Sequence, residues 1–391
     1  MYSARSQEIE PFHVMQLLQR AKELEAAGED VIHLEVGEPD FDTAEPIIAA
    51  AQQALIDGRT RYTAALGIPE LRQALADFYA SRYQLTIDPQ RILITPGGSG
   101  ALLMASSLLV EAGKHWLLAD PGYPCNRHFL RLVEAGAQLV PVGPEHNYQL
   151  TPELVEQYWN ENTVGVLVAS PANPTGTVLS KAELAALSAA VTAKGGHLVV
   201  DEIYHGLTYG TEASSVLEVD NDAFVLNSFS KYFGMTGWRL GWLVAPEQAV
   251  PELEKLAQNI YISAPTLSQY AALACFEPQS IEIFEQRRSE FAQRRDFLLP
   301  ALRKLGFKIE VEPKGAFYLY ADVSEFTEDA QAFCYHFLET EKVAFTPGID
   351  FGSYRANQHV RFAYAQSMEQ LQEAVQRIER GLASWKAHHA V

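Results

Sequence analysis

A lysine and an arginine lie eight residues apart in a segment rich in small residues, Ser228-Phe-Ser-Lys-Tyr-Phe-Gly-Met-Thr-Gly-Trp-Arg-Leu-Gly241. Glycine, serine and threonine at this density favour a loop over the interior of a helix or strand. A lysine amine can form a Schiff base with an aldehyde, and an arginine fork beside hydroxyl groups can hold a phosphate monoester. Because a single lysine or arginine is more often a solvated surface charge, Lys231 and Arg239 indicate a binding site only if other segments complete it.

A second place for an anion is indicated by Pro96-Gly-Gly-Ser-Gly100, which lies between a short apolar run and a segment rich in Ala and Leu. If this turn opens a helix, the Ser99 hydroxyl and the N–H groups around Gly98 and Gly100 lie at the positive end of the helix dipole. The same residues equally suit an ordinary tight turn with a helix cap. The turn therefore supports an anion site only together with the arginine segment.

Three further loops follow apolar runs and carry Tyr123, Asn173 and Asp201. The Tyr123 ring can stack on a planar heterocycle, and Asn173 lies between two prolines that fix its amide. Asp201 ends a buried strand, where a carboxylate is costly unless it is paired, for example by a protonated pyridine nitrogen. Tyr204 can direct its hydroxyl at the same ligand. Taken alone, each residue also has a structural explanation. Tyr123 and Asn173 could belong to ordinary turns, and Asp201 could cap a helix or form an ion pair.

Composition excludes several classes of protein. The 391 residues suffice for two domains, and 48% hydrophobic with 20% charged residues is ordinary for a soluble globular protein. A formal charge of −19 disfavours nucleic acid or an anionic membrane as the main partner. Three widely spaced cysteines indicate neither a disulfide framework nor a zinc or other metal site. With no secretory signal and no apolar run long enough to cross a bilayer, we expect a cytoplasmic protein.

Short apolar runs alternate with Ala- and Leu-rich segments between residues 90 and 245. We expect strands at 91–95, 115–119, 164–169, 197–200, 223–227 and 240–244, and helices at 100–112, 125–135 and 180–194. This alternation predicts an α/β fold with a mostly parallel sheet flanked by helices. Ligands bind beyond the carboxyl ends of such strands, where all the loops named above begin.

The pattern changes beyond about residue 285 and predicts a smaller α+β domain. We expect a helix at 285–304, strands at 307–311, 316–320 and 359–364, an amphipathic helix at 328–341 and a final helix. An N-terminal segment (1–45), with a helix at 13–27 and a strand at 31–36, is expected to pack on this domain. The expected division is thus 1–45, a large cofactor-binding domain at 46–285 and a small domain at 286–391.

Three motifs, Asn173-Pro-Thr-Gly176, Asp201-Glu-Ile-Tyr204 and Ser228 to Arg239, follow one another in a specific order and spacing. In these motifs, and over essentially its whole length, the chain resembles the fold-type I pyridoxal-phosphate enzymes of the class I/II aminotransferase family. The resemblance implies an aspartate-aminotransferase-like fold and pyridoxal 5'-phosphate as cofactor. It also implies amino acid and 2-oxo acid substrates.

The resemblance implies a role for each matching residue. Lys231 would be the Schiff-base lysine, Asp201 the partner of the pyridine nitrogen, and Asn173 and Tyr204 the donors to the phenolic oxygen of the ring. Tyr123 would stack on that ring. The implied phosphate ligands are Gly98, Ser99, Gly100, Ser228 and Arg239. Arg361 would bind the substrate α-carboxylate beside Gly37, and Tyr62 would reach the phosphate of a neighbouring subunit, which implies a homodimer with shared active sites.

We therefore expect a transaminase with ping-pong kinetics that uses Lys231 as the proton carrier. We expect a mild preference for neutral or aromatic amino acids, because no motif places an arginine for a second carboxylate. Arg59, Arg61 and Arg127 could still reach the pocket, and aspartate or glutamate stays open as one partner. A C–S lyase or another β-eliminating enzyme would share every cofactor residue. A cofactor-binding regulatory protein would need a DNA-binding module, which we do not expect before Pro11. A nicotinamide-dependent oxidoreductase is not favoured, because this chain lacks the Gly-x-Gly-x-x-Gly spacing that such an enzyme needs.

Overall fold

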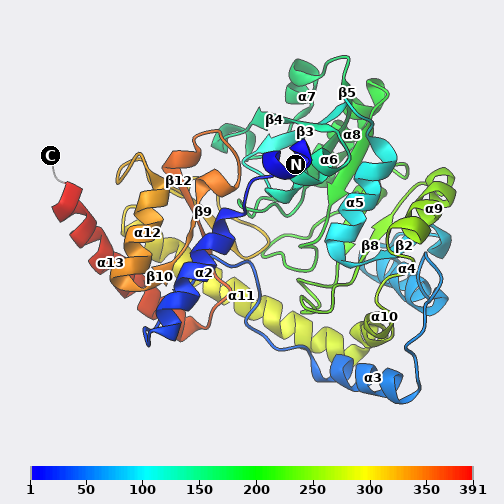
Figure 1. Ribbon diagram of the computed structural model, residues 1–391, viewed down its shortest axis with the longest axis horizontal. Coiled ribbons are helices and arrows are strands. Elements are labelled where there is room, and N and C mark those ends of the chain that lie inside the picture. Colours follow the sequence, from blue (N-terminus) through cyan, green and yellow to red (C-terminus); the bar gives the residue numbers. More distant parts are fainter. Residues whose placement is uncertain (1, 390–391) are drawn as a thin grey trace.

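The structure is a computed structural model that describes residues 2–389, and its larger part is built on a seven-stranded sheet (Figure 1). The strand order is β2 (Ile92–Thr95), β8 (Gly241–Val244), β7 (Phe224–Ser228), β6 (His197–Asp201), β5 (Thr163–Ala169), β3 (His115–Asp120) and β4 (Gly136–Pro141). Only β8 runs antiparallel to its neighbours. The mostly parallel sheet predicted from the apolar runs is thereby confirmed.

Helices cover both faces of this sheet because successive strand residues point to opposite sides. On one face Leu118, Leu167 and Leu226 pack against α5 (Gly97–Leu109), α6 (Cys125–Leu132) and α9 (Val250–Ile260). On the other face Val168, Val200 and Val225 belong to the core that includes α4 (Pro69–Tyr83), α7 (Pro152–Tyr158) and α8 (Lys181–Ala193). Burial on both faces explains why the strands are continuous apolar runs rather than alternating ones.

A smaller sheet lies beside the large one (Figure 1). It consists of β11 (Thr346–Pro347), β12 (His359–Ala363) and β9 (Tyr318–Asp322), all antiparallel. Next to it, β1 (Ile32–His33) pairs in parallel with β10 (Val343–Ala344), which brings residues 32–33 of the N-terminal segment into this part of the molecule. The helices here are α2 (His13–Ala26), α12 (Ala330–Glu341) and α13 (Met368–His389).

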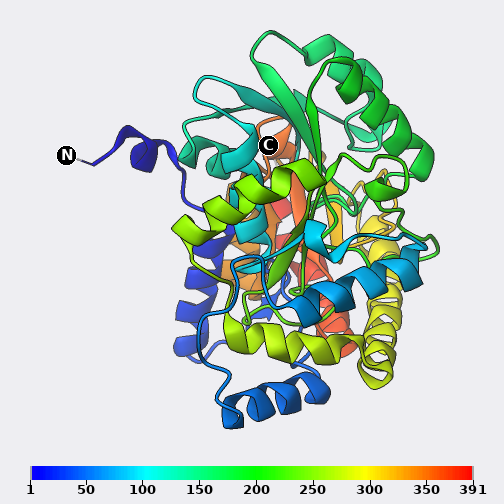
Figure 2. The same cartoon turned by 90° about the vertical axis from the view of Figure 1, so that its right-hand side faces the viewer.

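The two parts are linked by the long helix α11 (Pro278–Lys304), which runs from α3 (Glu45–Ile56) and α10 (Thr266–Leu273) to the small sheet (Figure 1). The expected boundary at residue 285 falls inside this helix, and the division into domains stays a prediction. In Figure 2 the segment that carries α1 (Ala4–Glu8) projects from the body of the molecule. It is tied to α6 by an ion pair from Glu8 to Arg131, and to the turn after α6 by one from Arg5 to Glu134.

Two expectations about strands differ from the structure. Residues 307–311 form no strand: Phe307 and Ile309 are buried as an alternating pattern requires, but only Lys308 bridges to Asp322. The expected strand at 31–36 has a regular ladder only at Ile32–His33, because the chain beyond it also bonds to β12, through the Ala363 N–H to the Leu34 carbonyl. At 307–311 the side chains alternate between buried and exposed although no ladder of hydrogen bonds forms. At 31–36 they do not alternate, since Val31, Ile32, Leu34 and Glu35 are all buried.

Residues 2–389 contain neither of two features that would indicate other functions. None of the helices there is both long and apolar enough to cross a membrane. In the same range, His, Cys, Asp and Glu side chains form no group of three or more that could hold a metal ion.

Candidate active site

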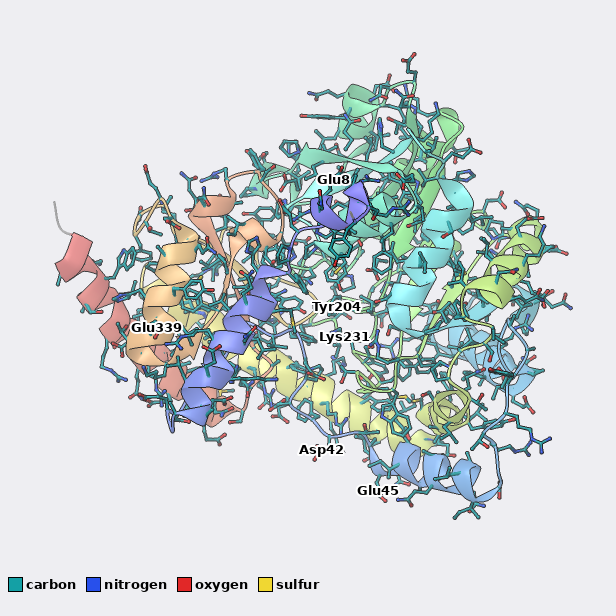
Figure 3. All side chains as sticks on the ribbon, in the orientation of Figure 1. Glu8, Asp42, Glu45, Tyr204, Lys231 and Glu339 are labelled. Atoms are coloured by element: carbon teal, nitrogen blue, oxygen red, sulfur yellow. The ribbon has the colours of Figure 1, made fainter. Side chains whose placement is uncertain are left out.

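A cavity of about 420 Å³ lies between the carboxyl ends of the large sheet and the small sheet. Figure 3 shows Lys231 and Tyr204 in this central position. Of the residues predicted from the sequence, the wall contains Gly37, Gly98, Ser99, Tyr123, Asn173, Asp201, Tyr204, Ser228, Lys231, Arg239 and Arg361. The cavity exists because β2, β3, β5, β6 and β7 all end at the same edge and turn into loops there.

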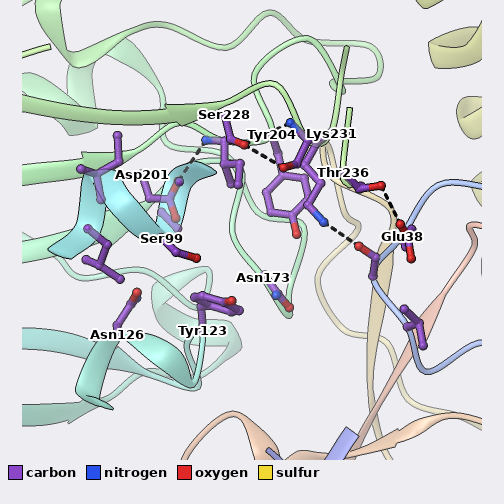
Figure 4. Close-up of a pocket in the computed structure, with 18 of the residues that line it drawn as sticks. Glu38, Ser99, Tyr123, Asn126, Asn173, Asp201, Tyr204, Ser228, Lys231 and Thr236 are labelled. Carbon is purple, nitrogen blue, oxygen red and sulfur yellow. Dashed lines mark hydrogen bonds between the residues drawn. The ribbon is translucent and has the colours of Figure 1, made fainter. Parts of the chain in front are cut away.

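Lys231 occupies the middle of the cavity and donates from Nζ to the carbonyl oxygen of Gly37 at 2.6 Å (Figure 4). Its ammonium also lies over the rings of Tyr204 and Phe317, at 5.9 and 5.7 Å from their centroids. Burial lowers the pKa of the Lys231 amine to about 8, although the Glu38 carboxylate opposes the shift. With this pKa about a tenth of the amine is unprotonated at pH 7, far more than in an ordinary exposed lysine, and this free amine can act as a nucleophile or proton acceptor.

Asp201 is the last residue of β6, and its Oδ1 accepts the Ile203 N–H at 3.0 Å. Burial raises the pKa of its carboxyl to about 6, and the Ile203 N–H and the Lys231 charge act in the opposite direction. Residues 2–389 supply no hydrogen bond to Oδ2, although the side chain lines the cavity. A cationic N–H donor in the cavity would pair this carboxylate and lower its pKa.

An anion cradle is formed where α5 begins, close to Arg239. Gly97 has φ of +71°, and a Cβ there would lie 2.5 Å from Arg239 Nη2, so the guanidinium lies directly beside the helix start. Gly241 is needed for the close approach of β8, because its Cβ would lie 2.6 Å from the Gly97 carbonyl carbon. The Ser228 hydroxyl donates to Ser230 at 2.9 Å in the same wall. Helix N–H groups, hydroxyls and a guanidinium together suit a phosphate.

Arg361, on β12, is 4% exposed and forms no salt bridge with any residue in the range 2–389. Its guanidinium instead donates to neutral oxygens: Nη1 to Asn173 Oδ1 at 2.9 Å and Nη2 to the Glu35 carbonyl at 2.5 Å. The ring of Tyr318 lies 4.3 Å from its Cζ. A buried cation without a carboxylate partner is costly, and an anionic substrate group would supply that partner.

Two predicted residues lie outside the cavity wall. Gly100 packs inside α5, where a Cβ would meet the Pro96 ring at 2.8 Å. Tyr62 is 80% exposed, and its proposed contact with a neighbouring subunit stays a prediction. Arg59 and Arg127 are occupied elsewhere, with Arg59 over the Tyr270 ring and Arg127 beside Glu10.

Several residues of the wall were not predicted from the sequence. The hydroxyls of Tyr318 and Tyr204 share a hydrogen bond of 2.8 Å. The Glu38 carboxylate accepts a hydrogen bond from the Thr236 hydroxyl at 2.6 Å. Phe12 from the N-terminal segment also lines the cavity. Tyr318 belongs to an expected strand and Glu38 directly follows Gly37, so position offered a signal for both, whereas nothing in the sequence marked Phe12.

The α/β fold and the cavity with a buried lysine at its centre are those of an enzyme that binds a small molecule at the edge of its sheet. The family follows from similarity to known proteins. Residues 29–378 match the sequence profile of the family aminotransferase class I and II. The chain belongs to this family of pyridoxal-phosphate-dependent transferases.

Individual relatives agree with this assignment. The chain is 40% identical to valine–pyruvate aminotransferase of Mycobacterium tuberculosis, over 96% of this chain and 97% of that one. A crystal structure of an aminotransferase from the same organism superposes with a TM-score of 0.95 at 39% identity, covering 98% and 99% of the two chains. Aspartate aminotransferase of Thermus thermophilus, solved with maleate, gives a TM-score of 0.92 at 34% identity and covers 97% and 99%. The aspartate-aminotransferase-like fold is confirmed.

Proposed function

We propose that this chain is a pyridoxal-phosphate-dependent transaminase that moves an amino group between a neutral L-amino acid and a 2-oxo acid. The observation that carries the proposal is the placement of Lys231, Asp201 and Arg239 on the wall of one cavity. Each of these residues alone has an ordinary structural explanation. A lysine with a lowered pKa, a buried carboxyl and an anion cradle together match the aldehyde, pyridine nitrogen and phosphate of one cofactor.

The residues present fit this cofactor. The Arg239 cradle with Ser99 and Ser228 would hold the phosphate, the open Asp201 Oδ2 would accept the pyridinium N–H, and Lys231 would bind the aldehyde carbon. When bound, pyridoxal phosphate supplies an electron sink that makes loss of the amino acid Cα proton possible. Tyr123 would cover one face of its ring, and Asn173 and Tyr204 would bond its phenolic oxygen.

Lys231 is placed to carry the proton that transamination must move. Its Nζ lies in the centre of the cavity, and burial lowers its pKa to about 8, so the free amine is more abundant near neutral pH than in an exposed lysine. An amine in this state can take a proton from the substrate Cα and return it to another atom of the same complex. The Gly37 carbonyl, which accepts from Nζ, holds the amine in that position while it is free.

The substrate would enter with its α-carboxylate toward Arg361. The cavity wall also carries the apolar side chains Phe12, Val14, Met15 and Phe129. Arg239 and Arg361 are the arginines in the wall formed by residues 2–389, and both have proposed tasks. This wall favours an aliphatic or aromatic side chain, in agreement with the name of the valine–pyruvate relative.

A donor screen tests the proposal. Purified protein loaded with pyridoxal phosphate is mixed with single amino acids in the absence of an oxo acid, and the visible absorbance of the bound cofactor is followed. We expect valine, leucine, phenylalanine or alanine to convert the cofactor stoichiometrically to its amine form. Pyruvate should then restore the original spectrum. Steady release of ammonia without any requirement for an oxo acid would instead identify a lyase.

The pH dependence of cofactor capture follows from the lowered pKa of Lys231. The ammonium form, which predominates below about pH 8, cannot attack an aldehyde, whereas the free amine above that pH can. We expect the rate of pyridoxal phosphate capture by the cofactor-free protein to rise with pH and level off above about pH 8. Stopped-flow absorbance measures this rate. An alkylamine of ordinary pKa, about 10.4, is the control and should level off about two pH units higher.

We also propose a cytoplasmic homodimer that shares its active sites. The support is the 80% exposure of Tyr62, a large aromatic side chain in a segment that resembles the subunit-bridging segment of the family. Sedimentation gives the oligomeric state of the wild-type protein and of Tyr62→Ala. The affinity of both proteins for pyridoxal phosphate then tests whether Tyr62 reaches the phosphate of a neighbouring subunit.

A further inference from the structure

Helix α2 begins over the cavity without a cap from its own sequence. Its N-cap residue is Phe12, whose side chain forms no capping hydrogen bond. The Phe12 ring instead lines the cavity and meets the Tyr123 ring edge to face, at 6.5 Å between centroids. Because the first N–H groups of a helix need acceptors, another part of the chain must supply one.

That acceptor is Asp350, 337 residues away in sequence. Its Oδ1 accepts the His13 N–H at 2.8 Å, and its side chain is 2% exposed. Burial raises the pKa of the Asp350 carboxyl, while the Arg361 charge and the N–H groups of His13 and Val14 lower it. Its Oδ2 is buried and has no hydrogen-bond partner in the described chain. A carboxylate at this position also interacts favourably with the helix dipole of α2.

Asp350 belongs to a loop, residues 348–354, that contacts two further walls of the cavity. The Phe351 ring lies 4.7 Å from Arg361 Cζ, and the Phe351 carbonyl accepts the Gly122 N–H at 2.8 Å, next to Tyr123. Farther along, the Ser353 and Tyr354 N–H groups donate to the buried Asp120 carboxylate. The 348–354 loop therefore joins the start of α2, the Tyr123 turn and Arg361.

We propose that Asp350 is a positioning residue for substrate side chains, because its carboxylate fixes the start of α2 and so holds Phe12, Val14 and Met15 against the cavity. This inference rests on the proposed transaminase function. It explains why an apolar residue stands at the N-cap of α2, where serine, threonine or aspartate would ordinarily stand. Phe12 contributes to the pocket, and the capping task falls to a loop already tied to Arg361 and Tyr123.

The test compares Asp350→Leu, which removes the acceptor, with Asp350→Asn, which keeps an oxygen at Oδ1. Asp329→Leu is the matched control: Asp329 caps α12 by accepting the Ala332 N–H at 3.0 Å, and it is not part of the cavity wall. The first readout is amide hydrogen exchange of residues 12–18 in the cofactor-loaded protein. We expect roughly tenfold faster exchange in Asp350→Leu, near wild-type exchange in Asp350→Asn, and no change there in Asp329→Leu.

The second readout is the split between KM and kcat for leucine and for alanine as donors. In Asp350→Leu we expect the leucine KM to rise about tenfold, with little change in kcat or in the alanine KM, because the small side chain barely reaches Phe12. Asp350→Asn should restore the leucine KM. If Asp350→Leu does not fold, Asp350→Ala replaces it, since shortening the side chain introduces no new atoms.

Unchanged exchange at residues 12–18 would overturn the inference, as would equal losses for leucine and alanine. Equal effects of Asp329→Leu and Asp350→Leu on the leucine KM would also overturn it, because general destabilisation would then suffice. A wild-type protein that transaminates no amino acid would contradict the proposed function, whereas the exchange result would still decide whether Asp350 holds α2.

Discussion

Replacing Lys231 by alanine is expected to abolish transamination while leaving the phosphate cradle able to bind. The variant loses both the amine that would bind the cofactor aldehyde and the base that would move the Cα proton. General acid–base catalysis alone contributes about 10²- to 10⁴-fold, so we expect a loss of at least about 10⁴-fold in kcat when both roles disappear. Single-turnover absorbance with leucine and pyruvate measures the loss.

Binding must be measured separately from turnover in this variant. Arg239, Ser99 and Ser228 lie in other parts of the wall and do not bond to Lys231. Pyridoxamine phosphate, which needs no covalent bond, should therefore bind Lys231→Ala in equilibrium dialysis. Lys181→Ala, at an exposed lysine paired with Glu218, is the control and should keep full activity. Substantial turnover in Lys231→Ala would mean that another residue moves the proton.

Much of this site could be predicted because a simple geometric rule places it. Parallel strands end at one edge of a sheet, so Tyr123, Asn173, Asp201 and Lys231, each shortly after an apolar run, had to meet there. The continuous apolar runs identified the strands, since both faces are buried. The cavity that these residues line is therefore a direct consequence of the order of strands and loops along the chain.

The parts that could not be predicted depend on contacts between distant segments. One acceptor for the Arg361 guanidinium is the backbone carbonyl of Glu35, which any residue type would provide. The first N–H of α2 is capped by Asp350, which lies 337 residues away. Capping patterns in a sequence involve only residues close to the start of the helix. Residues 307–311 alternate correctly and still lack a ladder, because a strand needs a partner as well as a pattern.

Replacing Arg361 by alanine is expected to lower kcat/KM for amino acid donors by about 10²- to 10⁴-fold. Hydrogen bonds to charged groups contribute about 1.5–3 kcal/mol each, and a bidentate carboxylate would lose two of them. The loss should affect the amino acid and the oxo acid alike, since both carry the same carboxylate. Initial rates with leucine and with pyruvate varied in turn measure the two values.

The same substitution also releases Asn173, whose Oδ1 accepts from Arg361 Nη1 at 2.9 Å, so part of the loss would come from a displaced amide. Two comparisons separate the contributions. Arg361→Lys keeps the charge but not the planar fork, and it should fall between wild type and alanine. A primary amine without a carboxylate should react equally slowly with wild type and Arg361→Ala if carboxylate binding is the cause. If that amine loses as much as leucine does, the role of Arg361 is to position Asn173, and the carboxylate binds elsewhere.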